Sequence, residues 1–155
     1  MNEREIYLTP EGADNLRAEL EKLRGPHREA LAKRLRHAIQ QGDLSENADY
    51  ITAKEAQGFL EGRIQEIETI LRQAVIVDNS GSSDQVGIGS TVVVSLNGGQ
   101  PETFQVVGIK EASPRQGKIS HESPIGQALV GKRVGDTAEA ATPGGKLTLR
   151  ILEIR

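Results

Sequence analysis

Apolar residues in the first half of the chain recur at alternating steps of four and three residues, the spacing of a packed helix face. A helix start is indicated at Thr9-Pro10-Glu11, because Thr can cap a helix and Pro suits its first position. The first seam runs through Leu16, Leu20, Leu23, His27, Ala30 and Arg34, flanked by Leu31 and Leu35. A second seam runs through Ala53, Gln57, Leu60, Ile64, Ile67, Leu71 and Ala74. The pattern predicts two long helices that pack against each other.

The residue numbers of the two seams predict how these helices pair. Facing residues of an antiparallel hairpin have a constant sum of residue numbers, and Leu20 with Ile67 and Arg34 with Ala53 both give 87. The chain is therefore predicted to fold back near residue 43. Gly42 supports the same turn, since a helix commonly ends at a left-handed glycine.

Gly25-Pro26 interrupts the first helical pattern. Proline removes a helical hydrogen bond and crowds the preceding turn, so this dipeptide predicts a kink or a break. Gly58 and Gly62 face it on the second helix and would leave room for the irregular turn.

The pattern changes from helical to strand-like after Asp78. Runs of β-branched residues at 91–96, 103–109 and 146–154 predict strands, and Thr-Pro-Gly-Gly at 142–145 predicts a turn. Ser123-Pro124 predicts the start of a short helix that ends at Gly131.

These elements predict an α+β protein in three parts. Residues 1–78 form an antiparallel coiled-coil hairpin arm, residues 79–85 form a polar linker, and residues 86–155 form a small β-rich domain with one short helix. A length of 155 residues fits one ordinary domain or two small ones.

Composition narrows the function classes. The chain has no cysteine and no long apolar run, so we expect a cytoplasmic protein with no membrane partner. Two Tyr and two Phe are too few for the stacking platforms of single-strand binders. Residues 1–78 carry 11 basic and 15 acidic side chains, and residues 79–155 carry 8 and 7, so neither part is a basic duplex-binding domain. No recognition-helix motif is present, and sequence-specific DNA binding is not expected.

Acidic residues cluster where the hairpin is predicted to turn, in QGDLSENAD at 41–49. Asp43 and Glu46 suit a helix cap, in which Asp accepts backbone N–H bonds and Glu reaches back as in a capping box. The same two carboxylates, one helical turn apart, would also suit a shared Mg²⁺ ligand pair. The local sequence leaves both interpretations open.

Several motifs resemble the Gre family of bacterial transcript cleavage factors, most closely its GreA type. The matching segments are LTPEG at 8–12, GDLSENADY at 42–50, QGFLEGRI at 57–64, SPIGQALVGKRVGD at 123–136 and TPGG at 142–145. The resemblance implies a hairpin arm that enters the secondary channel of bacterial RNA polymerase and an FKBP-like domain that docks on the channel rim. It also implies an accessory factor, itself no enzyme, that stimulates the polymerase's Mg-dependent endonucleolytic cleavage of the nascent RNA 3′ end in backtracked complexes.

The resemblance carries over to individual residues. It implies that Asp43 and Glu46 bind a Mg²⁺ ion completed by the polymerase; Ser45 has no role in the family pattern. Asn47, Asp49 and Tyr50 are expected to support the tip. For Asp49 we expect support of the pair through water and for Tyr50 a contact with RNA, and the alternative for both is an ordinary helix-surface or tip-packing role. Contacts with RNA or the channel wall are expected of basic residues near the tip, namely Arg34, Arg36, His37 and Lys54. Polymerase docking is expected at Ser123 and Pro124. The alternative for the basic residues is an ordinary solvated face of the coiled coil, and Ile39 stands where the family usually has an Arg. The alternative for Ser123 and Pro124 is an ordinary helix cap.

Two other functions remain open from the sequence. One is a regulator or inhibitor that binds the secondary channel without cleavage, which would not need the Asp43–Glu46 pair. The other is a prolyl isomerase, which needs an aromatic pocket, whereas Phe104 is the only aromatic residue after Phe59. For the favoured function the expected partners are RNA polymerase and the nascent RNA 3′ end, and we expect a monomer.

Overall fold

The computed structural model of the chain describes residues 5–82 and 84–155. These residues divide into two compact units. One unit is Asp14–Gln73, and the other joins the residues up to Ala13 with Ala74–Arg155. Residues 74–78 therefore belong with the β-rich unit, so the compact helical unit is shorter than the arm of residues 1–78 expected from the sequence.

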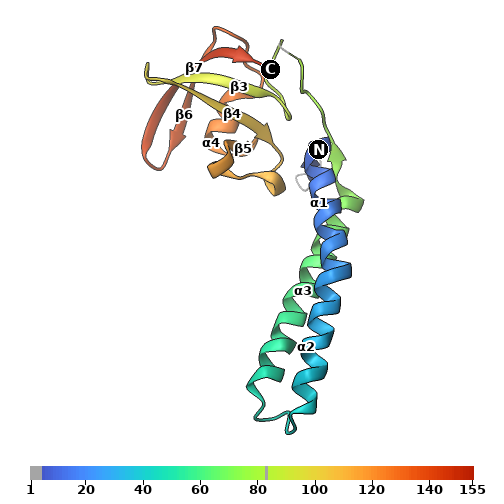
Figure 1. The fold of residues 1–155 in the computed structure, drawn as a ribbon. Coiled ribbons are helices and arrows are strands. Elements are labelled where there is room, and N and C mark those ends of the chain that lie inside the picture. Colours follow the sequence, from blue (N-terminus) through green and yellow to red (C-terminus); the bar gives the residue numbers. More distant parts are fainter. Residues whose placement is uncertain (1–4, 83) are drawn as a thin grey trace. The chain divides into compact units, whose positions relative to one another are not determined.

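A long helical hairpin forms the first unit (Figure 1). The chain runs toward the tip through α1 (Pro10–Lys22), a π-helical segment (Leu23–His27) and α2 (Arg28–Gln40). It runs back from the tip through α3 (Ala48–Gln73). The buried apolar side chains of the two sides are Leu16, Leu20, Ala38, Ala53, Ile64, Ile67 and Ile70. The predicted hairpin, with its turn near residue 43, is confirmed.

The interruption at Gly25-Pro26 is a π-helical turn, and the helix continues on both sides of it. Lys22 and Arg28, which flank the segment, both have right-handed helical backbone angles. Pro26 cannot donate a helical hydrogen bond, and its ring would crowd the carbonyl of the preceding turn. The wider π-turn accommodates the proline by adding one residue to a turn, as π-bulges do. The sequence predicted a kink or a break here, and the structure shows a local widening.

This extra residue corrects the first predicted seam. Beyond the π-helical segment, the predicted seam residues Ala30 and Arg34 are exposed, whereas Leu31 and Leu35 are half-buried and Ala38 is buried. Each inward position thus lies one residue later than the four-and-three spacing predicts. The predicted facing of Arg34 with Ala53 fails, because Arg34 is exposed and Ala53 is buried.

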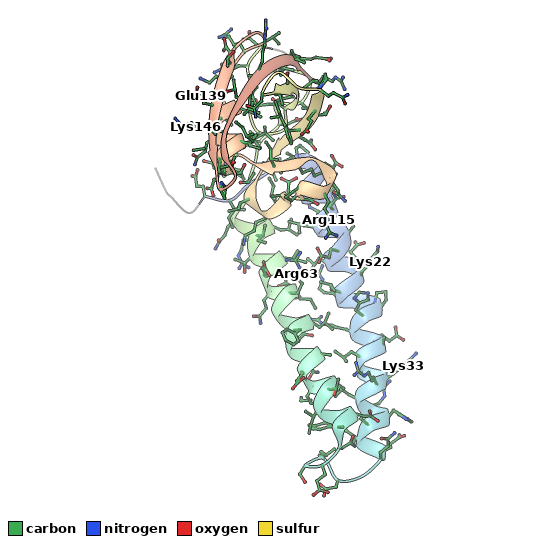
Figure 2. The ribbon with its side chains drawn as sticks, turned by 90° about the vertical axis from the view of Figure 1, so that its left-hand side faces the viewer. Lys22, Lys33, Arg63, Arg115, Glu139 and Lys146 are labelled. Atoms are coloured by element: carbon green, nitrogen blue, oxygen red, sulfur yellow. The ribbon has the colours of Figure 1, made fainter. Side chains whose placement is uncertain are left out.

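Ion pairs between the two sides of the hairpin flank its apolar seam. Arg63 of α3, labelled in Figure 2, donates from Nε and Nη2 to the two carboxylate oxygens of Glu19 on α1, each at 3.0 Å. Nearer the tip, Arg28 donates to both carboxylate oxygens of Glu61 at 2.8 and 2.7 Å. The two bidentate pairs link the sides of the hairpin at two levels, and the Arg28–Glu61 pair lies where buried apolar side chains are fewer.

A five-stranded mixed sheet forms the centre of the second unit (Figure 1). Its strands are β3 (Thr91–Leu96), β4 (Pro101–Val107), β5 (Lys118–Ser120), β6 (Thr137–Thr142) and β7 (Gly145–Ile154), in the order β5-β4-β3-β7-β6. The β4–β5 pair is parallel, and the other neighbouring pairs are antiparallel. The sequence predicted β3 at its observed bounds and β4 and β7 within two residues, but it did not predict β5 or β6. β6 reads Thr-Ala-Glu-Ala-Ala-Thr, and alanine is a poor strand former.

The short helix α4 (Pro124–Leu129) packs against β6 and β5. Its Leu129 joins the apolar core formed by side chains of the sheet, including Val92, Val106, Leu149 and Ile151. The predicted helix is present, and it ends two residues before Gly131. An α+β fold with a helical hairpin and a β-rich part bearing one short helix is confirmed.

The chain segments at the base of the hairpin belong to this second unit. β1 (Tyr7–Leu8) and β2 (Val75–Ile76) pair in parallel. Thr9 precedes α1, where its hydroxyl accepts a hydrogen bond from the Gly12 N–H at 3.0 Å. The Glu111 carboxylate accepts from the backbone N–H of Thr9 at 2.7 Å and from its hydroxyl. A residue 102 positions away in sequence thus helps to cap the first helix.

Candidate functional site at the hairpin tip

The chain leaves α2 through a glycine that has a left-handed backbone. Gly42 has φ of +111°, and its N–H donates to the carbonyl of Ile39 at 3.3 Å. A side chain would be strained at this angle, so glycine suits the position where the arm turns. The residues that follow, 43–46, form the loop at the end of the hairpin.

Asn47 caps α3 and corrects the capping hypothesis for Asp43 and Glu46. Its Oδ1 accepts a hydrogen bond from the Tyr50 N–H at 3.0 Å, and α3 begins at the next residue, Ala48. Asp43 and Glu46 both lie in the loop before the helix, so they do not form the expected capping box. The signal for Asn47 was present in the sequence, because Asn caps helices as well as Asp does.

The Asp43 carboxylate is held by Ser45, a residue to which the sequence assigned no role. Oδ1 of Asp43 accepts hydrogen bonds from the Ser45 hydroxyl at 2.8 Å and from the Ser45 N–H at 3.0 Å. The hydroxyl bond, followed by the backbone bond, lowers the pKa of Asp43 below its ordinary value. The carboxylate is therefore ionised at neutral pH.

The acidic residues of the tip share one open hollow. Asp43, Glu46 and Asp49 line it, together with Gln41, Asn47 and Ala48. Tyr50 is half-buried on the first turn of α3 and does not belong to the lining. The structure thus brings together four of the five residues that the sequence placed at the tip site.

The chemistry of this hollow suits part of a magnesium site. Magnesium takes oxygen ligands, and it commonly uses one or two protein carboxylates and completes its octahedron with water and phosphate. Asp43 and Glu46 supply two such carboxylates. Within residues 5–82 and 84–155, no group of three His, Asp or Glu side chains is arranged to hold a metal ion.

The four basic residues expected to meet RNA or the channel wall are all exposed on α2 and α3. His37 lies 3.0 Å from the Gln41 side chain through its Nε2, and Lys54 donates to Gln57 at 3.0 Å. Arg34 and Arg36 enter none of the ion pairs found among the described residues. All four side chains therefore lie on the surface, where a partner can reach their nitrogen atoms.

Ser123 and Pro124 differ in solvent exposure and in hydrogen bonding. The Ser123 hydroxyl accepts from the Gly126 N–H at 3.1 Å and donates to the Ser120 carbonyl at 2.7 Å, so it caps α4 and fastens the preceding turn. Pro124 is exposed at the first position of α4. The cap expected as the alternative for Ser123 is thus present in the structure.

Both parts of the chain match one family. Residues 6–76 match the N-terminal domain of the GreA/GreB family, described as "Transcription elongation factor, N-terminal". Residues 81–155 match the family's C-terminal domain. The chain belongs to the GreA/GreB family of transcription elongation factors. The resemblance drawn from the sequence motifs is confirmed.

Relatives of the GreA type match over the full length. The transcription elongation factor GreA of Chloroflexus aggregans is 47% identical, covering 100% of both chains. GreA of Lactococcus lactis is 44% identical over 98% of this chain and 99% of its own, and GreA of Bacillus subtilis is 42% identical over 98% of each. The family assignment rests on these sequence matches.

A solved structure of the family is also similar. The crystal structure of GreA factor homolog 1 of Thermus thermophilus has 35% sequence identity, covers 98% of this chain and 99% of its own, and superposes with a TM-score of 0.44.

None of the helices in the described part of this GreA-type chain has the length and apolar character needed to cross a membrane.

Proposed function

We propose that this GreA-type factor inserts its hairpin tip into the secondary channel of RNA polymerase and stimulates Mg-dependent cleavage of the nascent RNA 3′ end in backtracked complexes. GreA factors stimulate the polymerase's own cleavage activity and are not catalysts themselves, so RNA polymerase is the partner and the chain is not a nuclease. The observation that carries the proposal is that Asp43 and Glu46 line one open hollow at the end of a long arm.

Asp43 and Glu46 would hold the Mg²⁺ ion jointly with ligands of the polymerase. A magnesium ion there would stabilise charge on the oxygens of the phosphodiester under attack. Ser45 orients the Asp43 carboxylate, and Asp49, on the same hollow, supports the pair through water. Tyr50 contacts the RNA, and Arg34, Arg36, His37 and Lys54 contact RNA phosphates or the channel wall.

The rest of the chain delivers this tip. We assign the arm to residues 1–78, the linker to residues 79–85 and the polymerase-docking domain to residues 86–155. Pro124 is exposed, so it supplies the docking contact, while Ser123 shapes the turn that presents it. The factor acts as a monomer in the cytoplasm, where bacterial RNA polymerase works.

The tip acids are tested by Asp43→Asn and Glu46→Gln, which remove charge and keep size. With purified polymerase, backtracked complexes carrying labelled RNA and Mg²⁺, each variant should lower the rate of stimulated cleavage by about 10- to 100-fold, because charge stabilisation of a transition state is worth several kcal/mol. Binding to the polymerase and helix content by circular dichroism should stay at wild-type values.

Glu21→Gln is the matched control, since Glu21 is an exposed acid on α1 at the other end of the arm. It should stimulate cleavage like the wild type. Wild-type protein that binds polymerase and leaves the transcript length unchanged would make the chain a non-cleaving channel regulator. Full activity of both tip variants would remove Asp43 and Glu46 from the mechanism.

A further inference from the structure

We propose that Asn47 is a positioning residue, whose side chain ties the end of α2 to the start of α3 and thereby fixes the loop that carries Asp43 and Glu46. This inference rests on the proposed function of the tip. It assigns a distinct task to a side chain that is not itself a metal ligand.

The side-chain amide of Asn47 makes one hydrogen bond to each helix. Its Nδ2 donates to the carbonyl of Ala38 in the last turn of α2 at 2.7 Å. Its Oδ1 accepts from the N–H of Tyr50 in the first turn of α3 at 3.0 Å. N–H groups in the first turn of a helix lack partners within that helix, and the Tyr50 N–H finds one in the Asn47 amide. The Ala38 carbonyl accepts a long turn bond from the Gln41 N–H at 3.2 Å, and the shorter bond from Asn47 adds to it.

Only one orientation of the amide satisfies these contacts. With oxygen and nitrogen exchanged, the amide oxygen would face the Ala38 carbonyl and the NH₂ group would face the Tyr50 N–H. Two acceptors and two donors would then oppose each other. The position therefore requires a donor and an acceptor on two separate atoms of one short side chain, which Asn provides; ionised Asp has no donor, and Ser has only a single oxygen.

The bond to Ala38 lies where water is largely excluded. Ala38 is 1% exposed, and the bond itself is part-buried. Hydrogen bonds sheltered from water are stronger than exposed ones. The Asn47–Ala38 link is therefore a firm attachment in an otherwise exposed tip.

Residues 39–46 lie inside the loop that this bond closes. The Ser45 bonds to Asp43 are local to the loop and do not attach it to either helix. At the α2 end, attachment comes from turn bonds of Gln41 and Gly42 at 3.2 and 3.3 Å, which are longer than the 2.7 Å Asn47 bond. The location of the two carboxylates relative to the arm thus depends strongly on Asn47.

The test distinguishes the capping of α3 by Asn47 from the hydrogen bond that Asn47 donates to the Ala38 carbonyl. Asn47→Ser and Asn47→Asp keep a good cap for α3, because Ser, Asp and Asn cap helices about equally well, but both remove the amide NH₂ that donates to the Ala38 carbonyl. We expect both variants to keep wild-type helix content and the same half-saturating concentration of factor in the polymerase cleavage assay. The maximal cleavage rate should fall about tenfold or more, because small misplacements of reacting groups have large effects on rate.

A second measurement reads the loop without any activity. Backbone ¹⁵N order parameters of residues 43–46 in the free, full-length factor should fall from rigid values to about 0.6 or below in Asn47→Ser, while those of α3 stay unchanged. Asn15→Ser, at an exposed position on α1, makes the same chemical change away from the tip and should behave as wild type in both measurements.

The outcomes separate this inference from the proposed function. Wild-type cleavage rate and wild-type loop order in Asn47→Ser would show that Asn47 is only a cap and would overturn the proposal. If the wild-type factor stimulates no cleavage, the proposed function fails, and the order parameters of residues 43–46 still decide whether Asn47 holds the loop.

Discussion

Gly42 shows how much one residue contributes to the tip. It has φ of +111°, and the space where a Cβ would lie is open, with no atom within 4 Å. A substitution here therefore tests backbone strain without a steric clash. Gly58 on α3 has equally open space but lies inside a regular helix, so the same substitution there tests helix propensity alone.

Gly42→Ala should lower the free energy of unfolding by about 1–2 kcal/mol, the cost of a left-handed backbone for a residue with a Cβ. Gly58→Ala should raise it by about 0.5–1 kcal/mol, since alanine loses less entropy in a helix. Urea unfolding of the full chain, followed by far-UV circular dichroism, measures both. Equal effects of the same sign would mean that the turn at Gly42 does not need glycine.

Cross-helix ion pairs hold the outer part of the hairpin, where apolar residues are few. The pair between Arg28 of α2 and Glu61 of α3 is bidentate and exposed. Hydrogen bonding to Arg28 lowers the pKa of Glu61, and the positive charge of Arg28 adds to this effect. The ionised carboxylate is therefore favoured in the folded hairpin over the unfolded chain.

This shift predicts a pH dependence of stability. Because the pKa of Glu61 is lower in the folded state, its contribution is present above the ordinary glutamate pKa of 4.5 and is lost as the pH falls through the folded-state pKa. Arg28→Gln should return the pKa of Glu61 toward 4.5 and reduce the loss of stability on acidification. Side-chain ¹³C NMR titration and urea unfolding at neutral and acid pH measure the two effects.

Lys33→Gln removes the same charge from α2 without touching Glu61, because Lys33 lies near Glu29 at 3.8 Å. It should leave the titration of Glu61 as in the wild type. An unchanged Glu61 titration in Arg28→Gln would refute the role of the ion pair.

At the scale of the whole molecule, the residues proposed for docking and those proposed for metal binding belong to different compact units. Pro124 lies on the β-rich unit and the tip acids lie on the hairpin. Substitutions in the two units should therefore affect different parameters of the same assay: the concentration of factor needed, and the maximal cleavage rate.

Pro124→Ala should raise the half-saturating concentration of factor about tenfold, the equivalent of about 1.4 kcal/mol of binding, and leave the maximal cleavage rate unchanged. Pro114→Ala is the matched control, since Pro114 is also exposed and begins a short helical turn, Pro114–Gln116, in the same unit. Titration of the cleavage assay with each variant measures both parameters. A lower maximal rate with unchanged affinity for Pro124→Ala would argue against docking at this position.

The sequence determined those features that follow from local periodicity. Alternating steps of four and three residues specified the hairpin and its turn, and the β-branched run at 91–96 specified β3. The family motifs were likewise local, and each lay in order along the chain. Such patterns can be interpreted without knowledge of the tertiary contacts, because the geometry of a helix or strand repeats with a fixed period.

Only the tertiary structure decided between local choices of nearly equal energy. Asp43 and Asn47 are equally good caps, and Asn47 caps α3 while its amide also reaches the Ala38 carbonyl. Pro26 could break or widen its helix; the structure keeps the helix continuous, with the π-helical segment and α2 packed against α3 and the buried face of α2 shifted by one residue. Glu111 helps to cap the first helix through bonds that span 102 positions, and no local pattern can specify a partner so distant in sequence.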